Sequence, residues 1–105
     1  MRNKYGAIKT KIDGITFASK GEALRYRDLK IMERGYIIKH LKLQEKFPIK
    51  VNDKLICNYI ADFTYFENGV YVVEDFKGIS TPIFRIKAKL FEAIYGYKIR
   101  ITGRK

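Results

Sequence analysis

Several features are scarce or absent in this sequence of 105 residues, and each absence excludes a class of protein. The single cysteine, Cys57, excludes a disulfide-linked scaffold and a thiolate zinc site, and it is typical of a reducing compartment. The two prolines and eight glycines form no linker or low-complexity tract. No apolar run reaches the roughly 18 residues of a membrane-spanning helix, and the N-terminus lacks the apolar stretch of a signal peptide. We therefore expect one small soluble domain over residues 1–105, located in the cytoplasm.

Acidic residues are half as frequent as basic ones, which leaves the chain strongly positive. Lys and Arg number 22 against 11 Asp and Glu, so the formal net charge is +11. Such a charge favours binding to a polyanion, with nucleic acid first and an anionic membrane surface second. The hydrophobic fraction of 47% is enough for a modest core and excludes a wholly disordered chain. The charge alone does not decide whether a bound polyanion is held or cut.

Two segments have the periodicity and end signals of helices. Ser19-Lys20-Gly21-Glu22 is a capping box, and the apolar residues that follow predict a helix over about residues 20–34 that stops at Gly35. A second helix is expected from Pro82 to the residue before Gly96. Its expected apolar stripe comprises Ile83, Ile86, Leu90 and Ile94, widened by Phe84, Ala88, Phe91 and Tyr95.

The remaining segments are predicted to form strands. Residues 36–51 are expected to be extended, and Asn68-Gly69 joins two β-rich runs, 55–66 and 70–77, into a hairpin. Residues 98–101 alternate like a last strand. Further turns are indicated at Asp13-Gly14, in a short irregular hairpin, and at Asn52-Asp53-Lys54. The chain is therefore expected to be α/β in the order α-β-β-β-α-β, with a mixed central sheet flanked by two helices.

The Asn68-Gly69 turn determines which residues of its two strands face each other. Whether the loop has two or four residues, Asp62 falls directly opposite Asp75. Facing side chains on antiparallel strands have Cβ atoms about 4.5–5.5 Å apart, where two carboxylates repel. A shared proton or a cation has to offset that repulsion, and a hard divalent ion such as Mg²⁺ fits best. The register therefore predicts a metal site at this pair.

Side chains alternate between the two faces of a strand, and this alternation places a third group beside the pair. Asp75 and Lys77 project from one face, and Glu74 projects from the other. An ammonium beside two metal-bound carboxylates is suited to orient a water or to stabilise a phosphorane-like transition state. The plainer alternatives are an Asp75–Lys77 surface ion pair and a solvated Asp62. The apolar neighbours of Asp62 predict a strand buried on both faces, where a charged side chain is rare without function.

For the other polar residues, a structural role is the favoured interpretation over a functional one. The capping box explains Glu22 completely, and Glu22 joins the acids only if the helix start packs beside the hairpin end. The single histidine, His40, is interpreted as a strand residue, and Cys57 as a core residue. Gln44 is interpreted as an exposed strand amide, with a phosphate contact as the alternative.

The helix acid, the two facing aspartates and the lysine together resemble the PD-(D/E)XK nuclease superfamily. The wider match is to a small phage-encoded branch of it, similar to Holliday-junction resolvase-type endonucleases. The residues that carry this resemblance are Lys4-Tyr5-Gly6, Asp13-Gly14-Ile15-Thr16-Phe17, Ser19-Lys20-Gly21-Glu22-Ala23, Tyr59-Ile60-Ala61-Asp62-Phe63 and Val73-Glu74-Asp75-Phe76-Lys77-Gly78. The sequence departs from the commonest pattern at Ala61, where Pro often precedes the Asp, and at Asp75, where Glu is frequent.

The resemblance implies a restriction-endonuclease-like core and Mg²⁺-dependent cleavage of DNA phosphodiesters, with Mn²⁺ able to substitute. Carried over by position, the implied metal ligands are Glu22, Asp62, Asp75 and the backbone carbonyl of Phe76. The same three acids and Lys77, as the catalytic lysine, make up the implied catalytic residues.

The expected substrate is branched DNA such as a Holliday junction, in phage-linked recombination inside a bacterial host. A homodimer is expected because one site cuts one strand, and no organic cofactor is expected. Phosphate contacts are expected from Lys4, Lys9, Lys11, Lys20, Arg85, Lys87 and Lys89, of which the last three also fit a solvated helix face. The alternatives are a nicking or sequence-selective DNA endonuclease and a non-catalytic module that binds DNA or RNA.

Overall fold

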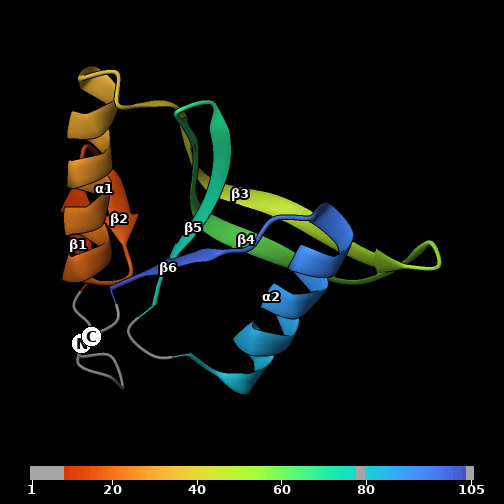
Figure 1. Ribbon diagram of the computed structural model, residues 1–105. Helices are drawn as coiled ribbons and strands as arrows, with labels where there is room; N and C mark the ends of the chain where they lie inside the picture. Colours follow the sequence, from red (N-terminus) through yellow and green to blue (C-terminus); the bar gives the residue numbers. More distant parts are fainter. Residues whose placement is uncertain (1–8, 78–79, 104–105) are drawn as a thin grey trace.

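The computed structural model describes residues 9–77 and 80–103, so Lys4 lies outside the described residues. Figure 1 shows the arrangement of the helices and strands. In chain order they are β1 (Thr10–Ile12), β2 (Ile15–Phe17), α1 (Lys20–Arg34), β3 (Ile38–Val51), β4 (Lys54–Glu67), β5 (Val70–Phe76), α2 (Pro82–Tyr95) and β6 (Arg100–Thr102). Neither helix in this part of the chain has the length and apolar character needed to span a bilayer.

The strands form two sheets. β1 and β2 make the expected short hairpin, with positive φ at both Asp13 and Gly14. The larger sheet has the order β3-β4-β5-β6, in which β6 runs parallel to β5 and the other neighbours are antiparallel. The α/β class and the mixed sheet are therefore confirmed, with β1 and β2 added ahead of the expected order.

The helix ends follow from local side-chain chemistry. Ser19 caps α1, because its hydroxyl accepts a hydrogen bond of 3.1 Å from the Glu22 backbone N–H. Gly96 ends α2 in the left-handed conformation at φ 83°. At the end of α1 the expectation is only partly met, because Gly35 has an ordinary φ of −87° and the next residue, Tyr36, takes the left-handed conformation at φ 61°.

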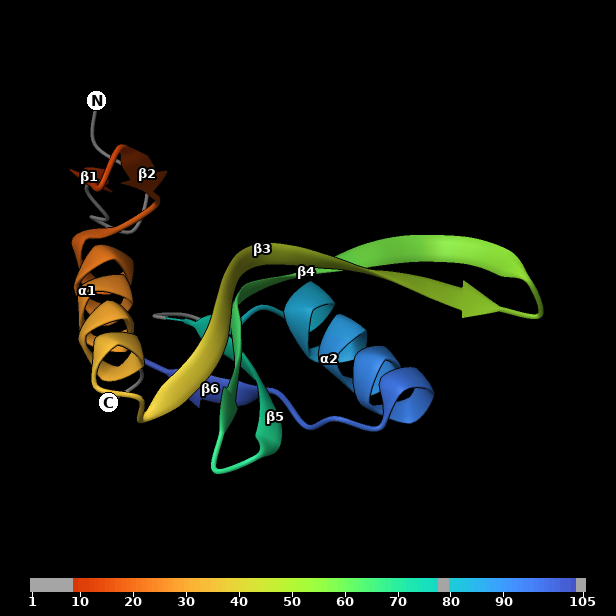
Figure 2. The same ribbon diagram turned by 90° about the horizontal axis from the view of Figure 1, so that it is seen from above.

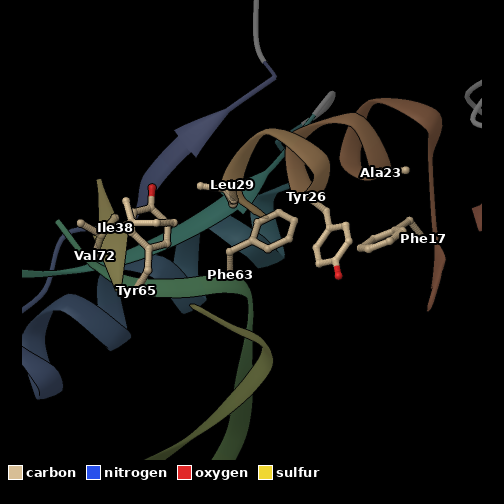
Figure 3. Close-up of a cluster of buried hydrophobic side chains, with 8 residues drawn as sticks. All are labelled: Phe17, Ala23, Tyr26, Leu29, Ile38, Phe63, Tyr65 and Val72. Atoms are coloured by element: carbon tan, nitrogen blue, oxygen red, sulfur yellow. The ribbon is translucent and has the colours of Figure 1, made fainter. Parts of the chain in front are cut away.

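Strands β3 and β4 form one long hairpin that bends sharply and runs out over α2 (Figure 2). The near half packs against α1 and the far half packs against α2. In β4, Phe63 and Tyr65 belong to the cluster of buried side chains under α1, shown in Figure 3. Tyr59 and Ala61 belong to the second cluster, with Phe91 of α2. The helix that covers the buried residues of β4 therefore changes between Ala61 and Phe63, from α2 to α1.

This bend corrects the expectation that the strand around Asp62 is buried on both faces. Tyr59, Ala61 and Phe63 are buried, but Ile60 is 48% exposed. Alternate residues of β4 point away from the helices, so an apolar sequence on both sides of an acid did not mean that both faces were covered.

The packed face of α2 also differs from the expected stripe. Phe91 is buried, and Phe84, Ala88, Leu90 and Tyr95 pack against the same cluster. Ile83, Ile86 and Ile94 are instead exposed. The aromatic residues that we expected to widen the stripe form its centre, because the far half of the hairpin presents Phe47 and Tyr59 as ring partners.

Candidate functional site: an acidic cluster at the bend of the hairpin

Asp62 and Asp75 are neighbours across β4 and β5, as the turn predicted. The ladder of paired residues runs from Glu67↔Val70 to Phe63↔Glu74, and the aspartates occupy the next position. The Asp62 backbone N–H donates to a carboxylate oxygen of Asp75 at 3.0 Å. In return, the Phe76 backbone N–H donates to the Asp62 carboxylate at 2.9 Å. Both carboxylates thus complete the end of a strand ladder and are held beside each other.

The bend brings Asp62 to the surface of a cleft. Asp62 sits between Ala61 and Phe63, where the helix that covers β4 changes from α2 to α1. On β3, Gln44 stands at the corresponding position with φ 55°, and its side-chain amide donates to Asp62 at 3.4 Å. Asp62 and Gln44 line a cleft of about 440 Å³ together with Glu22. Gln44 is the exposed strand amide that we expected, and it also contacts the acid.

Asp75 is almost completely buried, with 1% of its surface exposed. The Tyr59 hydroxyl donates a hydrogen bond to the carboxylate oxygen that Asp62 does not engage. Burial and the negative charge of Asp62 together raise the pKa of Asp75 to about 7, although the Tyr59 hydrogen bond and the Lys77 charge act to lower it. Asp75 is therefore a carboxyl group for which ionisation is costly unless a positive charge is near.

The start of α1 packs beside this pair, which meets the condition set for Glu22. Glu22 is 8% exposed although it lies in the first turn of a helix. Burial, the charge of Asp62 and, more weakly, the charge of Asp75 together raise its pKa to about 7. A capping residue would keep its ordinary pKa in water, so Glu22 serves both the helix end and the acidic cluster.

The Phe76 ring sets the approach of α1 to the sheet. It lies between two glycines, one at the start of α1 and one just after β6. A Cβ added at Gly21 would stand 2.5 Å from the ring, and one added at Gly103 would stand 2.6 Å from it. The absence of side chains at both positions lets the ring fit and brings Glu22 close to Asp62 of β4 and to the end of β5.

Lys77 supplies the cation of the cluster. Its backbone N–H donates to the Thr102 carbonyl at 2.9 Å, which continues the β5–β6 pairing. Its ammonium lies 4.7 Å from the centroid of the Phe84 ring. Its charge lowers the pKa of both Glu22 and Asp75. Lys77 and Tyr59 line a second cleft, of about 250 Å³, so two clefts flank the buried Asp75.

Glu74 has the separate position that the alternation predicted. Its carboxylate is fully buried and forms a two-pronged ion pair with Arg25 of α1, at 2.7 and 2.9 Å. The hydroxyls of Tyr65 and Thr102 also donate to it. Burial would raise the pKa of Glu74, but these hydrogen bonds outweigh burial and the pKa is lowered. Glu74 therefore fastens α1 to the sheet from the opposite face.

The donor set fits a hard divalent cation, although it is not a preformed cage. Among residues 9–77 and 80–103, no three acidic, histidine or cysteine side chains converge tightly enough to hold an ion as they stand. Asp62, Asp75 and Glu22 offer carboxylate oxygens, which Mg²⁺ prefers. Burial first, and the neighbouring carboxylates after it, raise the pKa values of Glu22 and Asp75, and a bound cation would offset both effects. Ligation would replace hydrogen bonds that these oxygens now accept.

The predicted phosphate contacts are spread over several elements. Lys20 lies beside the cluster at the start of α1, and Lys9 and Lys11 lie in and next to β1. Lys87 lines the same cleft as Lys77, and its ammonium donates to the Asn58 carbonyl at 3.4 Å. The other two, Arg85 and Lys89, are exposed on α2.

Sequence reasoning missed Tyr59 as a partner of Asp75 and Arg25 as the partner of Glu74. Tyr59 had one usable signal, because a buried tyrosine needs an acceptor for its hydroxyl. Arg25 follows Glu22 by three residues, so both side chains leave α1 on the same side. Which acid each would meet depends on how the helix docks, and that is a tertiary property.

Comparison with known proteins gives a family but no described activity. A family model described as "Protein of unknown function (DUF1064)" matches residues 2–103. No curated protein matches the chain, and no solved structure matches it.

Proposed function

The chain belongs to the DUF1064 family, and from the acidic cluster we propose that it is a divalent-metal-dependent endonuclease that hydrolyses DNA phosphodiesters. The observation that carries this proposal is the contact between Asp62 and Asp75 beside Lys77. Sheets avoid like charges at facing positions. A divalent metal ion held by Asp62 and Asp75 would offset that repulsion and would give both carboxylates a catalytic role.

In the proposed hydrolysis, different residues of the chain hold the metal ion, assist the water and position the ligands. Asp62, Asp75, Glu22 and the Phe76 carbonyl would hold Mg²⁺, with Mn²⁺ as a substitute. When bound, the ion polarises the phosphate and makes a water nucleophilic. Lys77 would orient that water or neutralise charge that develops on the phosphate oxygens. Tyr59 holds the Asp75 carboxylate in place.

The order of elements supports a restriction-endonuclease-like core within this proposal. From α1 onward the chain runs through a helix, three antiparallel strands, a helix and a strand parallel to its neighbour. The proposed site residues come from the start of α1, the bend of β4 and the end of β5, which is the distribution expected for a PD-(D/E)XK nuclease.

We propose branched DNA, of the Holliday-junction type, as the substrate in phage-linked recombination in the host cytoplasm. From α1 onward, the described helices and strands belong to the proposed core, and little of the described structure remains to recognise a base sequence. One site cuts one strand, so paired cuts need two copies of the chain. The exposed Ile83, Ile86 and Ile94 on α2 give an apolar surface that supports such self-association.

A non-catalytic nucleic-acid-binding module is the second candidate. It is favoured by the hydrogen bonds that now occupy both carboxylates of the pair. In such a protein the raised pKa of Asp75 would simply keep this buried carboxyl group protonated over a wider pH range. A nicking or sequence-selective endonuclease would use the same site and would differ only in the DNA that it cuts.

The test is cleavage of three labelled DNAs by the purified protein, namely a four-way junction, a flap and a linear duplex. We expect Mg²⁺ or Mn²⁺ to support cutting, with the junction cut fastest, and a chelator to abolish it. Asp62→Asn is expected to lower the rate at least 100-fold while DNA binding in the chelator is retained. If the wild-type protein binds all three DNAs and leaves them intact with either metal, it is a binding module.

A further inference from the structure

A pocket lies at the other end of the sheet from the acidic cluster, and the proposed hydrolysis makes no use of it. It is an open pocket of about 540 Å³ where α1 passes into β3, next to the turn between β4 and β5. Its lining includes Tyr36, Ile37, Lys39, His40, Phe66 and Asn68. Three of these side chains are aromatic rings, and one is a lysine without an ion pair in the described chain.

Tyr36 is the most unusual residue of the pocket. It sits at φ 61°, just after the end of α1, where its N–H bonds to Glu33 and the following N–H bonds to Met32. Glycine is the usual residue at that position, because a side chain in the left-handed conformation costs about 1 kcal/mol or more. Tyr36 is nevertheless 82% exposed, so the ring recovers little by burial. Folding therefore does not explain why a tyrosine stands there.

The neighbouring rings present faces and edges to the same pocket. Phe66 is 40% exposed, and its centroid lies 5.9 Å from that of His40 in an edge-on arrangement. His40 is itself held at φ 58°, where β3 and β4 shift their register. Residues in sparsely populated backbone conformations cluster at functional sites. Three residues with positive φ other than glycine line this pocket, namely Tyr36, His40 and the turn residue Asn68, and the first two carry rings.

We propose that this pocket binds an unpaired base of single-stranded DNA, stacked on Tyr36 and Phe66, with Lys39 at the adjoining phosphate. Every base has a π-face, so stacking on aromatic side chains tolerates any sequence. The net charge of +11 draws the phosphates to the surface. A paired base is already stacked between its neighbours and has to leave the duplex to stack on a side chain, so the pocket favours DNA with unpaired nucleotides.

The choice of DNA as the ligand rests on the proposed function. The pocket adds to that function the position of an unpaired base relative to the phosphate that is cut. Asp62 and Phe66 lie four residues apart on β4 and project to the same side. At about 3.3 Å per residue they are about 13 Å apart, the length of about four stacked nucleotides at 3.4 Å each. The base held in the pocket and the phosphate at the acids can therefore belong to one strand.

The test compares the affinity of the protein for a single-stranded oligonucleotide and for a duplex of equal length, by fluorescence anisotropy in a chelator. In the variant Tyr36→Gly, affinity for the single strand is expected to fall about tenfold and duplex affinity to stay within twofold. Its melting temperature should be unchanged or higher, because glycine suits the backbone there. Tyr36→Phe keeps the ring and is the matched control, with wild-type binding expected.

Loss of binding to both DNAs in Tyr36→Gly, or wild-type affinity of this variant for the single strand, would overturn the inference. A single strand that carries 2-aminopurine should also lose fluorescence on binding to the wild type and keep it with Tyr36→Gly. These results are separable from the proposed hydrolysis. Metal-dependent cutting with no effect of Tyr36→Gly contradicts the pocket alone, whereas base stacking without any cutting contradicts the nuclease alone.

Discussion

Glu74 and Asp75 are neighbours in β5, and their side chains leave the strand on opposite sides. Glu74 meets Arg25, which compensates its burial, and its pKa is lowered. Asp75 meets Asp62 and the Tyr59 hydroxyl, and its pKa is raised to about 7. Alternation along a strand predicted this difference in direction. It could not predict the partners, because Tyr59 and Arg25 reach the acids only after the helices dock.

The Tyr59 hydroxyl tunes Asp75, and Tyr59→Phe tests this role. Its hydrogen bond favours the ionised carboxylate, so its loss should raise the pKa of Asp75 further. If cleavage needs that carboxylate ionised, the acidic limb of the rate–pH profile should move up by about one pH unit. The matched control is Tyr65→Phe, which removes a hydroxyl from Glu74 instead and should leave the limb in place. A limb that moves equally in both variants would contradict this role.

The raised pKa of Asp75 also predicts how the stability of the metal-free protein depends on pH. Between pH 4 and about 7 the folded state retains a proton that the unfolded state has lost. Stability from this group is therefore complete below pH 4 and falls as the pH rises to 7. In urea titrations with a chelator, the free energy of unfolding of the wild type relative to Asp75→Asn should drop by about 3 kcal/mol across that window. A rise would contradict the assignment.

At the scale of the elements, local signals were sufficient wherever a turn or a cap defines the structure. The capping box begins α1 at Lys20, and the Asn68-Gly69 turn sets the β4–β5 register. The bend of the β3–β4 hairpin has no such local signal, because it arises when α1 covers one half and α2 the other. The same docking decides which side of α2 is buried, so Ile83, Ile86 and Ile94 of the expected stripe are exposed whereas Leu90 packs against the core.

The contact between α1 and the sheet predicts that alanine changes the stability of the protein differently at Gly21 and at Gly35, the glycines at the two ends of α1. Glycine to alanine usually stabilises a helix by about 0.5–1 kcal/mol. Gly21→Ala should instead destabilise the protein by about 1–3 kcal/mol and lower the cleavage rate, because the new methyl group meets Phe76, which Gly103 confines from the other side. Gly35→Ala is the control, because a Cβ added there would have its nearest neighbour at 3.6 Å, an ordinary contact distance. This substitution should leave the stability unchanged or raise it. Thermal unfolding by circular dichroism compares the two variants.

For the molecule as a whole, the acidic cluster makes the remaining surface more positive than the net charge suggests. With Glu22, Asp62 and Asp75 committed to the site, eight acids remain against 22 basic residues. Contacts with phosphates should therefore supply most of the affinity for DNA. The logarithm of that affinity should then fall linearly with the logarithm of the salt concentration. Lys20→Ala should weaken binding to every DNA and lower that slope by about one. An unchanged slope would place Lys20 outside the interface.

The central claim is that Asp75, with Asp62, forms a cutting site, while Glu74 holds the fold. It is tested most directly by the rate of Mg²⁺-dependent junction cleavage in Asp75→Asn and Glu74→Gln, at a temperature where circular dichroism shows both folded. We predict that Asp75→Asn cuts at least 100-fold more slowly than the wild type. Glu74→Gln, though about 3 kcal/mol less stable, should retain most of the rate. An inactive Glu74→Gln with an active Asp75→Asn would contradict the account.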